Sequence, residues 1–184
     1  SAPSTVAGAG ARAIRLHRPD PGSVALAPAA PGALGLTCVA AGTGIMTPSG
    51  ERAVEDLARG DMVMTLDSGA RPVRWIGERR VAARGDAAPI HFAAGALGYG
   101  RELLVSPQHR MLVSAPELEL LAGTREVLVP ATHLVIGRDI TVRPGGWVSY
   151  YHFMFDRHEL VWANGVPAES MRNWADPALR SSSR

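Results

Sequence analysis

The single cysteine of the chain, Cys38, stands at the boundary between two stretches of different composition. It follows a segment without aromatic residues and opens the run Cys38-Val-Ala-Ala-Gly-Thr-Gly-Ile-Met-Thr47. A cysteine thiolate is a strong nucleophile. A nucleophile at the first residue of a domain lies beside the peptide bond that joins the domain to the preceding segment. The sequence therefore predicts chemistry on the protein's own backbone, at the bond between Thr37 and Cys38.

A serine and a histidine three residues apart, Ser106 and His109, form a second group that could do chemistry. They lie in the run Leu104-Val-Ser-Pro-Gln-His-Arg-Met-Leu-Val113, between two apolar stretches. A thiol that attacks an amide needs a proton donor for the departing nitrogen, and a histidine near pH 7 suits that role. The developing oxyanion needs a hydroxyl or a backbone N–H. The residue types in this run match both needs, although His109 could also be a satisfied core histidine.

A third group lies between Tyr151 and Gly165 and holds His152, His158 and the dipeptide Asn164-Gly165. Either histidine could orient neighbouring groups or act as a base, and the sequence does not distinguish them. Together with the histidine of the Ser-x-x-His pair they could form a three-His metal site, but no carboxylate or cysteine spacing supports one. The Asn-Gly dipeptide could equally be a turn without a chemical role. We predict no metal and no cofactor.

Short apolar runs separated by turn residues follow one another from residue 36 onward, and they predict an all-β domain. The expected strands, in chain order, are 44–47, 52–54, 61–66, 71–76, 89–92, 102–106, 110–113, 127–129, 139–142, 147–155 and 159–163. Turn residues favour hairpins at 48–50, 67–69 and 156–157. Only short helical turns are expected, at 55–60 and 130–135.

Residues 1–36 differ in composition from the rest of the chain. Ala, Gly and Pro occupy most of these positions, and Phe, Trp and Tyr are absent from them. Such a segment buries too little apolar area to offset its ordering entropy. We therefore predict a linker at 1–36, a folded domain at 37–172 and a polar tail at 173–184.

Composition and charge restrict the classes of function. The chain has 184 residues, of which 46% are hydrophobic, which is enough for one core. Its net charge is +2, and no basic cluster is interleaved with aromatic residues, so no nucleic-acid partner is expected. No apolar run approaches the ~20 residues that cross a bilayer, so no membrane partner is expected either. One cysteine excludes an intrachain disulfide and a cysteine-cluster zinc site. We expect a monomer.

The three groups, in this order, resemble the Hint superfamily, the module that inteins and hedgehog autoprocessing domains share. The resemblance covers roughly residues 36–171 and is closest to the bacterial intein-like branch. Further motifs that support it are Thr47-Pro-Ser-Gly-Glu-Arg-Ala-Val-Glu-Asp-Leu57, Gly60-Asp-Met-Val63, Pro72-Val-Arg-Trp-Ile-Gly77 and Ala94-Gly-Ala-Leu-Gly98. It implies a horseshoe-like Hint fold of short strands and hairpins, in which the two ends of the domain meet near the site.

The resemblance also implies the roles of the residues. Cys38 would attack the carbonyl of Thr37 and convert the amide into a thioester. His109 would protonate the departing nitrogen, and Ser106, which stands where the family usually has Thr, would supply the hydroxyl. An unperturbed cysteine is only a few per cent thiolate at neutral pH, so local activation of Cys38 is expected.

The remaining candidates come from the third group. His152 stands where inteins commonly carry an Asp after the Tyr, and His158 matches a histidine that often precedes the Asn-Gly strand. Asn164 completes the candidate catalytic residues.

The chain departs from splicing inteins near the end of the domain. Those inteins end in His-Asn shortly after Asn-Gly, whereas this chain has Glu169 and Ser170 there, and neither can form a succinimide. Splicing is therefore not expected. The thioester would react with water, giving cleavage after Thr37, or with an external nucleophile or acceptor protein, giving transfer of the chain's own N-terminal flanking segment. No apolar segment after residue 171 supports a sterol acceptor. By resemblance to modules of larger, often secreted, bacterial proteins, an extracellular or cell-surface location is favoured.

Two other functions fit the same residues. The first is a Hint fold that has lost its activity and serves as an interaction module, because the C-terminal His-Asn pair is missing. The second is a cysteine hydrolase that acts in trans with Cys38 and His109, although no helical layer that would form a substrate pocket is expected. Cys38 could also be a small buried hydrophobic residue.

Overall fold

A computed structural model describes residues 37–114 and 123–171 of the chain. The linker predicted at 1–36 and the tail predicted at 173–184 lie outside the described residues. Within the described residues the structure is nearly all β, as the sequence predicts, and its helices are short 3₁₀ turns. None of those helices has the length and apolar character that crossing a membrane would require.

The strands are short and are distributed along the whole described chain. They are β1 Val39–Ala40, β2 Gly44–Thr47, β3 Gly50–Ala53, β4 Met62–Thr65, β5 Gly69–Pro72, β6 Trp75–Ala82, β7 Ile90–Phe92, β8 Leu103–Val105, β9 Arg110–Ser114, β10 Glu126–Pro130, β11 Ile140–Val142, β12 Trp147–Met154, β13 Leu160–Ala163 and β14 Val166–Glu169. The 3₁₀ turns are η1 Val54–Asp56, η2 Gly85–Ala87 and η3 Ala131–Leu134.

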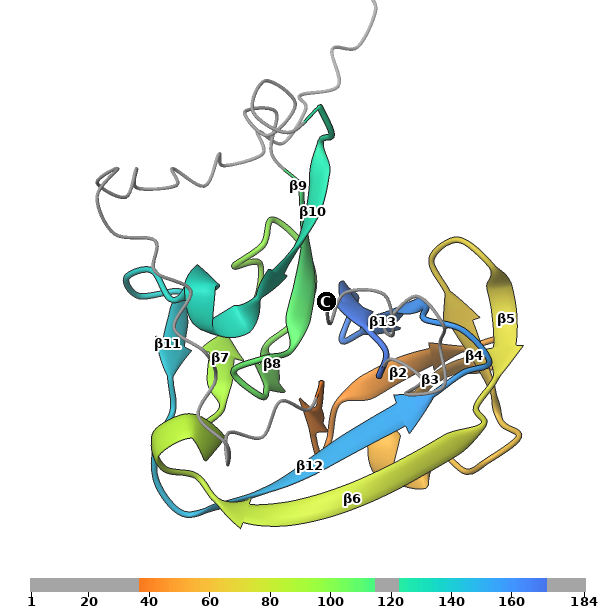
Figure 1. The fold of residues 1–184 in the computed structure, drawn as a ribbon, viewed down its shortest axis with the longest axis horizontal. Coiled ribbons are helices and arrows are strands. Elements are labelled where there is room, and N and C mark those ends of the chain that lie inside the picture. The colour runs from red at the N-terminus through yellow and green to blue at the C-terminus, as the bar shows by residue number, and fades with distance from the viewer. Residues whose placement is uncertain (1–36, 115–122, 172–184) are drawn as a thin grey trace, which may run out of the picture.

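The strands form two antiparallel sheets. The first has the order β11-β7-β8-β1-β12-β6, and the second has the order β10-β9-β14-β13-β2-β3, with the β4–β5 hairpin joined to β13. The long ribbon of β6 and β12 spans the lower edge of the molecule, from the side of β7 and β11 to the side of β4 and β5 (Figure 1). Strand β1, at the start of the described residues, pairs with β12, which comes late in the sequence.

Turn residues explain where the hairpins reverse. The expected hairpins at 48–50 and 67–69 are present as β2–β3 and β4–β5. Asn164 and Gly165 join β13 to β14 with φ angles of 50° and 77°. Two consecutive positive φ angles are those of a type I′ turn, whose twist matches that of paired strands and which Asn-Gly favours. The sequence analysis did not predict β14, the strand that follows this turn.

One expected strand, 71–76, is divided in the structure. Val73 donates its N–H to the carbonyl of Asp61 at 2.9 Å, whereas Arg74 donates its N–H to the carbonyl of Met154 at 2.8 Å. The backbone thus changes partner between these two residues, from the side of β4 to β12. The prediction of one continuous strand is wrong because local apolar pattern does not reveal a change of pairing partner.

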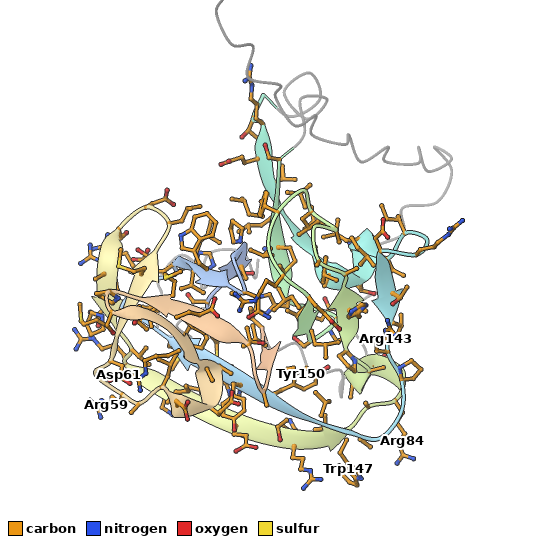
Figure 2. All side chains as sticks on the ribbon, turned by 180° about the vertical axis from the view of Figure 1, so that it is seen from behind. Arg59, Asp61, Arg84, Arg143, Trp147 and Tyr150 are labelled. Atoms are coloured by element: carbon orange, nitrogen blue, oxygen red, sulfur yellow. The ribbon has the colours of Figure 1, made fainter. Side chains whose placement is uncertain are left out.

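The core lies between the two sheets and draws on both. Its fully buried side chains include Ile45, Val63, Phe92, Leu103, Met111, Ile140 and Val161. Burial of such side chains contributes about 1.5–3 kcal/mol each to the free energy of unfolding. Most charged side chains point outward over the surface of this core (Figure 2), so the few buried polar groups stand out.

Candidate active site

Cys38 lies directly before β1, between β8 and β12. Val39 of β1 is opposite Val105 of β8 on one side and opposite Tyr151 of β12 on the other. One step back along the antiparallel register, Cys38 is next to Ser106 and His152. The sheet order therefore brings together three residues that are far apart in the sequence.

Two hydrogen bonds join Cys38 to Ser106. The N–H of Cys38 donates to the Oγ of Ser106 at 3.1 Å, and the N–H of Ser106 donates to the carbonyl oxygen of Cys38 at 3.0 Å. Both residues are buried. The Cys38 nitrogen belongs to the Thr37–Cys38 amide, so the hydroxyl of Ser106 contacts the nitrogen side of that bond.

The thiol of Cys38 is protonated in the resting structure. Burial raises its pKa to about 12, and the hydroxyl of Ser106 and the charge of Arg79 only partly offset this effect. The expectation of local activation is therefore wrong for this state. A buried thiolate lacks the hydration that stabilises its charge, which is why burial outweighs the two favourable neighbours.

His109 is also uncharged at neutral pH. Its ring is buried, and neither ring nitrogen has a hydrogen-bond partner among the described residues. Burial lowers its pKa to about 4, while the charge of Glu169 and the nearby backbone of Cys38 act in the opposite direction. The expectation of a histidine that titrates near pH 7 is wrong here because desolvation disfavours the imidazolium.

The two remaining histidines have different neighbours. The Nδ1 of His152 lies 3.7 Å from the Sγ of Cys38. Its pKa is lowered by burial and by the charge of Arg79, so the ring is neutral at neutral pH. His158 instead contacts Glu169, and its Nε2 lies 2.8 Å from the Oε1 of that carboxylate. The structure thus separates the two candidates that the sequence left equivalent, and only His152 contacts the thiol.

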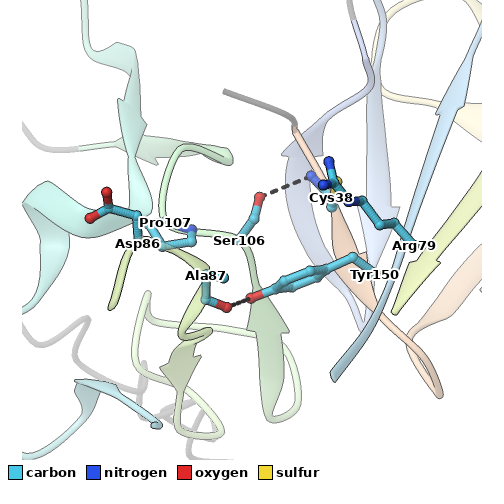
Figure 3. A pocket seen from close by; sticks show the side chains of 7 residues that line it. All are labelled: Cys38, Arg79, Asp86, Ala87, Ser106, Pro107 and Tyr150. Atoms are coloured by element: carbon cyan, nitrogen blue, oxygen red, sulfur yellow. Dashed lines mark hydrogen bonds between the residues drawn. The ribbon is translucent and has the colours of Figure 1, made fainter. Parts of the chain in front are cut away.

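A small cavity of ≈ 10 Å³ lies beside Cys38. It is lined by Cys38, Arg79, Asp86, Ala87, Ser106, Pro107 and Tyr150 (Figure 3). Tyr150 donates its hydroxyl to the carbonyl of Ala87 at 3.0 Å, which fixes one wall. Arg79 extends from β6, where it pairs with Tyr150 of β12.

The sequence alone does not identify Arg79 as a neighbour of the thiol. It is an exposed residue beside Arg80 in an eight-residue strand, and such arginines are usually solvated. In the order β1-β12-β6 its strand is two strands from β1, on the far side of β12. Only knowledge of that strand order could have identified it.

Asn164 has structural contacts on three sides. Its Oδ1 accepts hydrogen bonds from the N–H of Gly44 at 2.7 Å and from Arg101 at 3.1 Å, and its Nδ2 donates to the carbonyl of Glu102 at 2.6 Å. These bonds tie the β13–β14 turn to β2 and to the start of β8. These contacts give Asn164 a structural role.

Glu169 and Ser170, which stand at the positions of the intein His-Asn pair, are both buried. The Oγ of Ser170 accepts a hydrogen bond from the N–H of Glu159 at 3.0 Å, and the N–H of Ser170 donates to the carbonyl of Glu159 at 2.9 Å. Ser170 is therefore held by backbone contacts.

Within the described residues, no group of three His, Cys, Asp or Glu side chains could hold a metal ion, so the three-His alternative is wrong.

Comparisons with known proteins agree with this fold. The sequence model of the Hint domain family matches residues 37–175. Among solved structures, a bacterial intein-like domain from Clostridium thermocellum is 18% identical, covers 75% of this chain and 99% of its own, and gives a TM-score of 0.49. The AceL NrdHF class 3 split intein, in a splice-inactive variant, is 14% identical, with coverages of 75% and 99% and a TM-score of 0.50. No curated protein matches the chain.

The family match spans most of the chain and includes all six candidate residues. The chain belongs to the Hint domain family.

Proposed function

We propose that this domain cleaves its own backbone at the Thr37–Cys38 bond through a thioester, without splicing. The chain's own N-terminal flanking segment is the substrate, and the second nucleophile is water or an external acceptor. The observation that carries the proposal is the surroundings of Cys38. Its amide nitrogen donates to Ser106 at 3.1 Å, while its thiol lies 3.7 Å from His152.

In the first step the thiol must lose its proton. His152 is the base, because its ring is neutral at neutral pH and its Nδ1 lies beside the Sγ of Cys38. Arg79 and the hydroxyl of Ser106 stabilise the thiolate as it forms, since both lower the pKa of the thiol. A pKa of about 12 makes a free thiolate rare at neutral pH, so proton removal accompanies attack on the carbonyl of Thr37.

In the second step the C–N bond of the amide breaks and the nitrogen of Cys38 takes up a proton. His109 is the donor, and its pKa of about 4 makes its imidazolium a strong acid. At pH 7 only about one molecule in a thousand carries that proton. The first step is thus favoured at high pH and the second at low pH, and we expect slow cleavage with a rate maximum between the two limits.

The thioester then reacts with a nucleophile outside the chain. Water forms a new C–O bond at Thr37, the C–S bond breaks, and the thiol of Cys38 regains its proton. An external amine gives the corresponding amide. Splicing is not proposed because Ser170 replaces the cyclising Asn and its hydroxyl is held by the backbone of Glu159.

Intact-mass spectrometry tests the proposal on purified full-length protein beside a Cys38→Ala variant. Samples are incubated with and without dithiothreitol or hydroxylamine, at several pH values. We expect thiol- or hydroxylamine-dependent cleavage between residues 37 and 38 in the wild type only. An unbroken wild-type chain under every condition would overturn the proposal.

The resting protonation states favour one alternative, a Hint fold that serves as an interaction module. A neutral thiol and a neutral His109 are what an inactive site would also have. Failure of the cleavage experiment would leave this function as the better one. A hydrolase that acts in trans is less well supported, because the cavity beside Cys38 has only ≈ 10 Å³ of space, about enough for one water molecule and too little for a substrate.

A further inference from the structure

A buried carboxylate, that of Glu169, lies at the end of β14 next to the strand that follows His109. Ala168 of β14 is opposite Met111 of β9. In an antiparallel pair, one step forward on β14 corresponds to one step back on β9, so Glu169 is beside Arg110 and near His109. Glu169 is only 3% exposed. A carboxylate this deeply buried is costly unless positive charges or hydrogen bonds compensate it.

Three cationic or titratable groups surround Glu169. The Nε2 of His158 lies 2.8 Å from its Oε1, and the Nε of Arg110 lies 3.9 Å from its Oε2. The third group is His109, on which the charge of Glu169 acts. The side chains of His158 and Arg110 are partly exposed to water, whereas that of His109 is buried.

His109 depends on this carboxylate more than a surface histidine would. Neither of its ring nitrogens has a side-chain hydrogen-bond partner among the described residues. The groups that favour its charged form are the backbone of Cys38 and the carboxylate of Glu169. Only Glu169 supplies a full negative charge.

We propose that Glu169 is a positioning residue for the proton on His109: its buried negative charge stabilises the imidazolium that delivers a proton to the nitrogen of Cys38. His158 and Arg110 lie beside the carboxylate and hold it in place. The inference rests on the proposed function. It gives the residue at the position of the intein histidine a role in the first acyl shift, in a chain that lacks the C-terminal asparagine.

The direct test is a titration of the histidine rings by NMR. It uses full-length protein with Cys38→Ala, which cannot cleave, so the result does not depend on autoprocessing. In this background Glu169→Gln removes the charge but keeps the shape of the side chain. We expect His109 to titrate lower by about half a pH unit or more, because an opposite charge nearby has been lost.

A matched control exists in the pair of His91 and Glu102, in which the Nε2 of the histidine lies 2.7 Å from Oε1. Glu102→Gln removes a carboxylate that contacts a different histidine, and it should leave the titration of His109 as it was. If Glu169→Gln leaves His109 within about 0.2 pH units of the parent, the proposal is wrong.

A second variant covers the case in which Glu169→Gln does not fold. Arg110 has a side chain that is 45% exposed, so Arg110→Gln should be tolerated. It removes a positive charge that offsets Glu169, so His109 should titrate higher. An unchanged or lower value would contradict the proposal.

Cleavage kinetics then relate the charge to function. In protein with Cys38 intact, Glu169→Gln should slow thiol-induced cleavage at pH 7 by the same factor by which it reduces the protonated fraction of His109. An unchanged rate would overturn the role of Glu169. Absence of cleavage in the wild type would overturn the proposed function while leaving the titration valid.

Discussion

Cys38 and Ser106 are joined through both of their backbone N–H groups: that of Cys38 donates to Oγ of Ser106 at 3.1 Å, and that of Ser106 donates to the carbonyl of Cys38 at 3.0 Å. The pairing fixes the plane of the Thr37–Cys38 amide relative to the hydroxyl. It also places the hydroxyl where it can favour the thiolate of Cys38. One side chain thus contacts the leaving nitrogen and assists the nucleophile.

Removal of this hydroxyl should slow cleavage. Ser106→Ala removes a buried hydrogen bond worth about 0.5–1.5 kcal/mol, and we expect the rate of thiol-induced cleavage to fall by about tenfold. Ser106→Thr keeps the hydroxyl and should retain most of the rate. Rates come from intact-mass time courses at pH 7. Equal rates for the Ala and Thr variants would show that the hydroxyl has no role.

His152 should be more important for the rate than any other histidine except His109. Its Nδ1 is 3.7 Å from the thiol, and a general base contributes about 10²–10⁴ to the rate. His152→Gln should therefore reduce cleavage by about a hundredfold or more at pH 7. His133, which is exposed and does not line the cavity beside Cys38, supplies the control His133→Gln with an unchanged rate. A normal rate in the His152 variant would require another base.

The sequence was sufficient to predict most strands because each has its own apolar run and turn residues. The hairpins at 48–50 and 67–69 are local features, and they lie where the turn residues indicate. The family motif likewise identified Ser106 as the neighbour of Cys38, since β8 and β1 are adjacent in the structure.

The protonation of the site could not be predicted in the same way. The pKa values of Cys38 and His109 are set mainly by burial, which depends on how the two sheets close over these side chains. A sequence gives the ordinary pKa of a residue type, not the amount of water around it. Arg79 and Glu169 were missed as neighbours of the site for a related reason, because strand order alone brings them there.

Arg79 should affect the acidity of the thiol. Its charge lowers the pKa of Cys38, so Arg79→Gln should raise that pKa further and leave less thiolate at every pH below it. Because Cys38 is the only cysteine, the rate of its alkylation by iodoacetamide at pH 8 and 9, followed by intact mass, reports the thiolate of Cys38 alone. Arg80→Gln is the control, since that guanidinium lies over the ring of Trp147. A greater effect of Arg80→Gln than of Arg79→Gln would contradict this role.

His109 should make the folded domain sensitive to acid. Its pKa is about 4 in the folded state and about 6.5 when unfolded. The unfolded chain thus binds more protons between these values, so the stabilisation is complete above pH 6.5 and is lost as the pH falls toward 4. The loss amounts to about 3 kcal/mol. Urea unfolding of Cys38→Ala protein at pH 7, 6, 5 and 4.5 measures it. Adding His109→Gln should flatten the dependence, whereas adding His133→Gln should not. Equal slopes in all three proteins would show that the burial of His109 does not control acid stability.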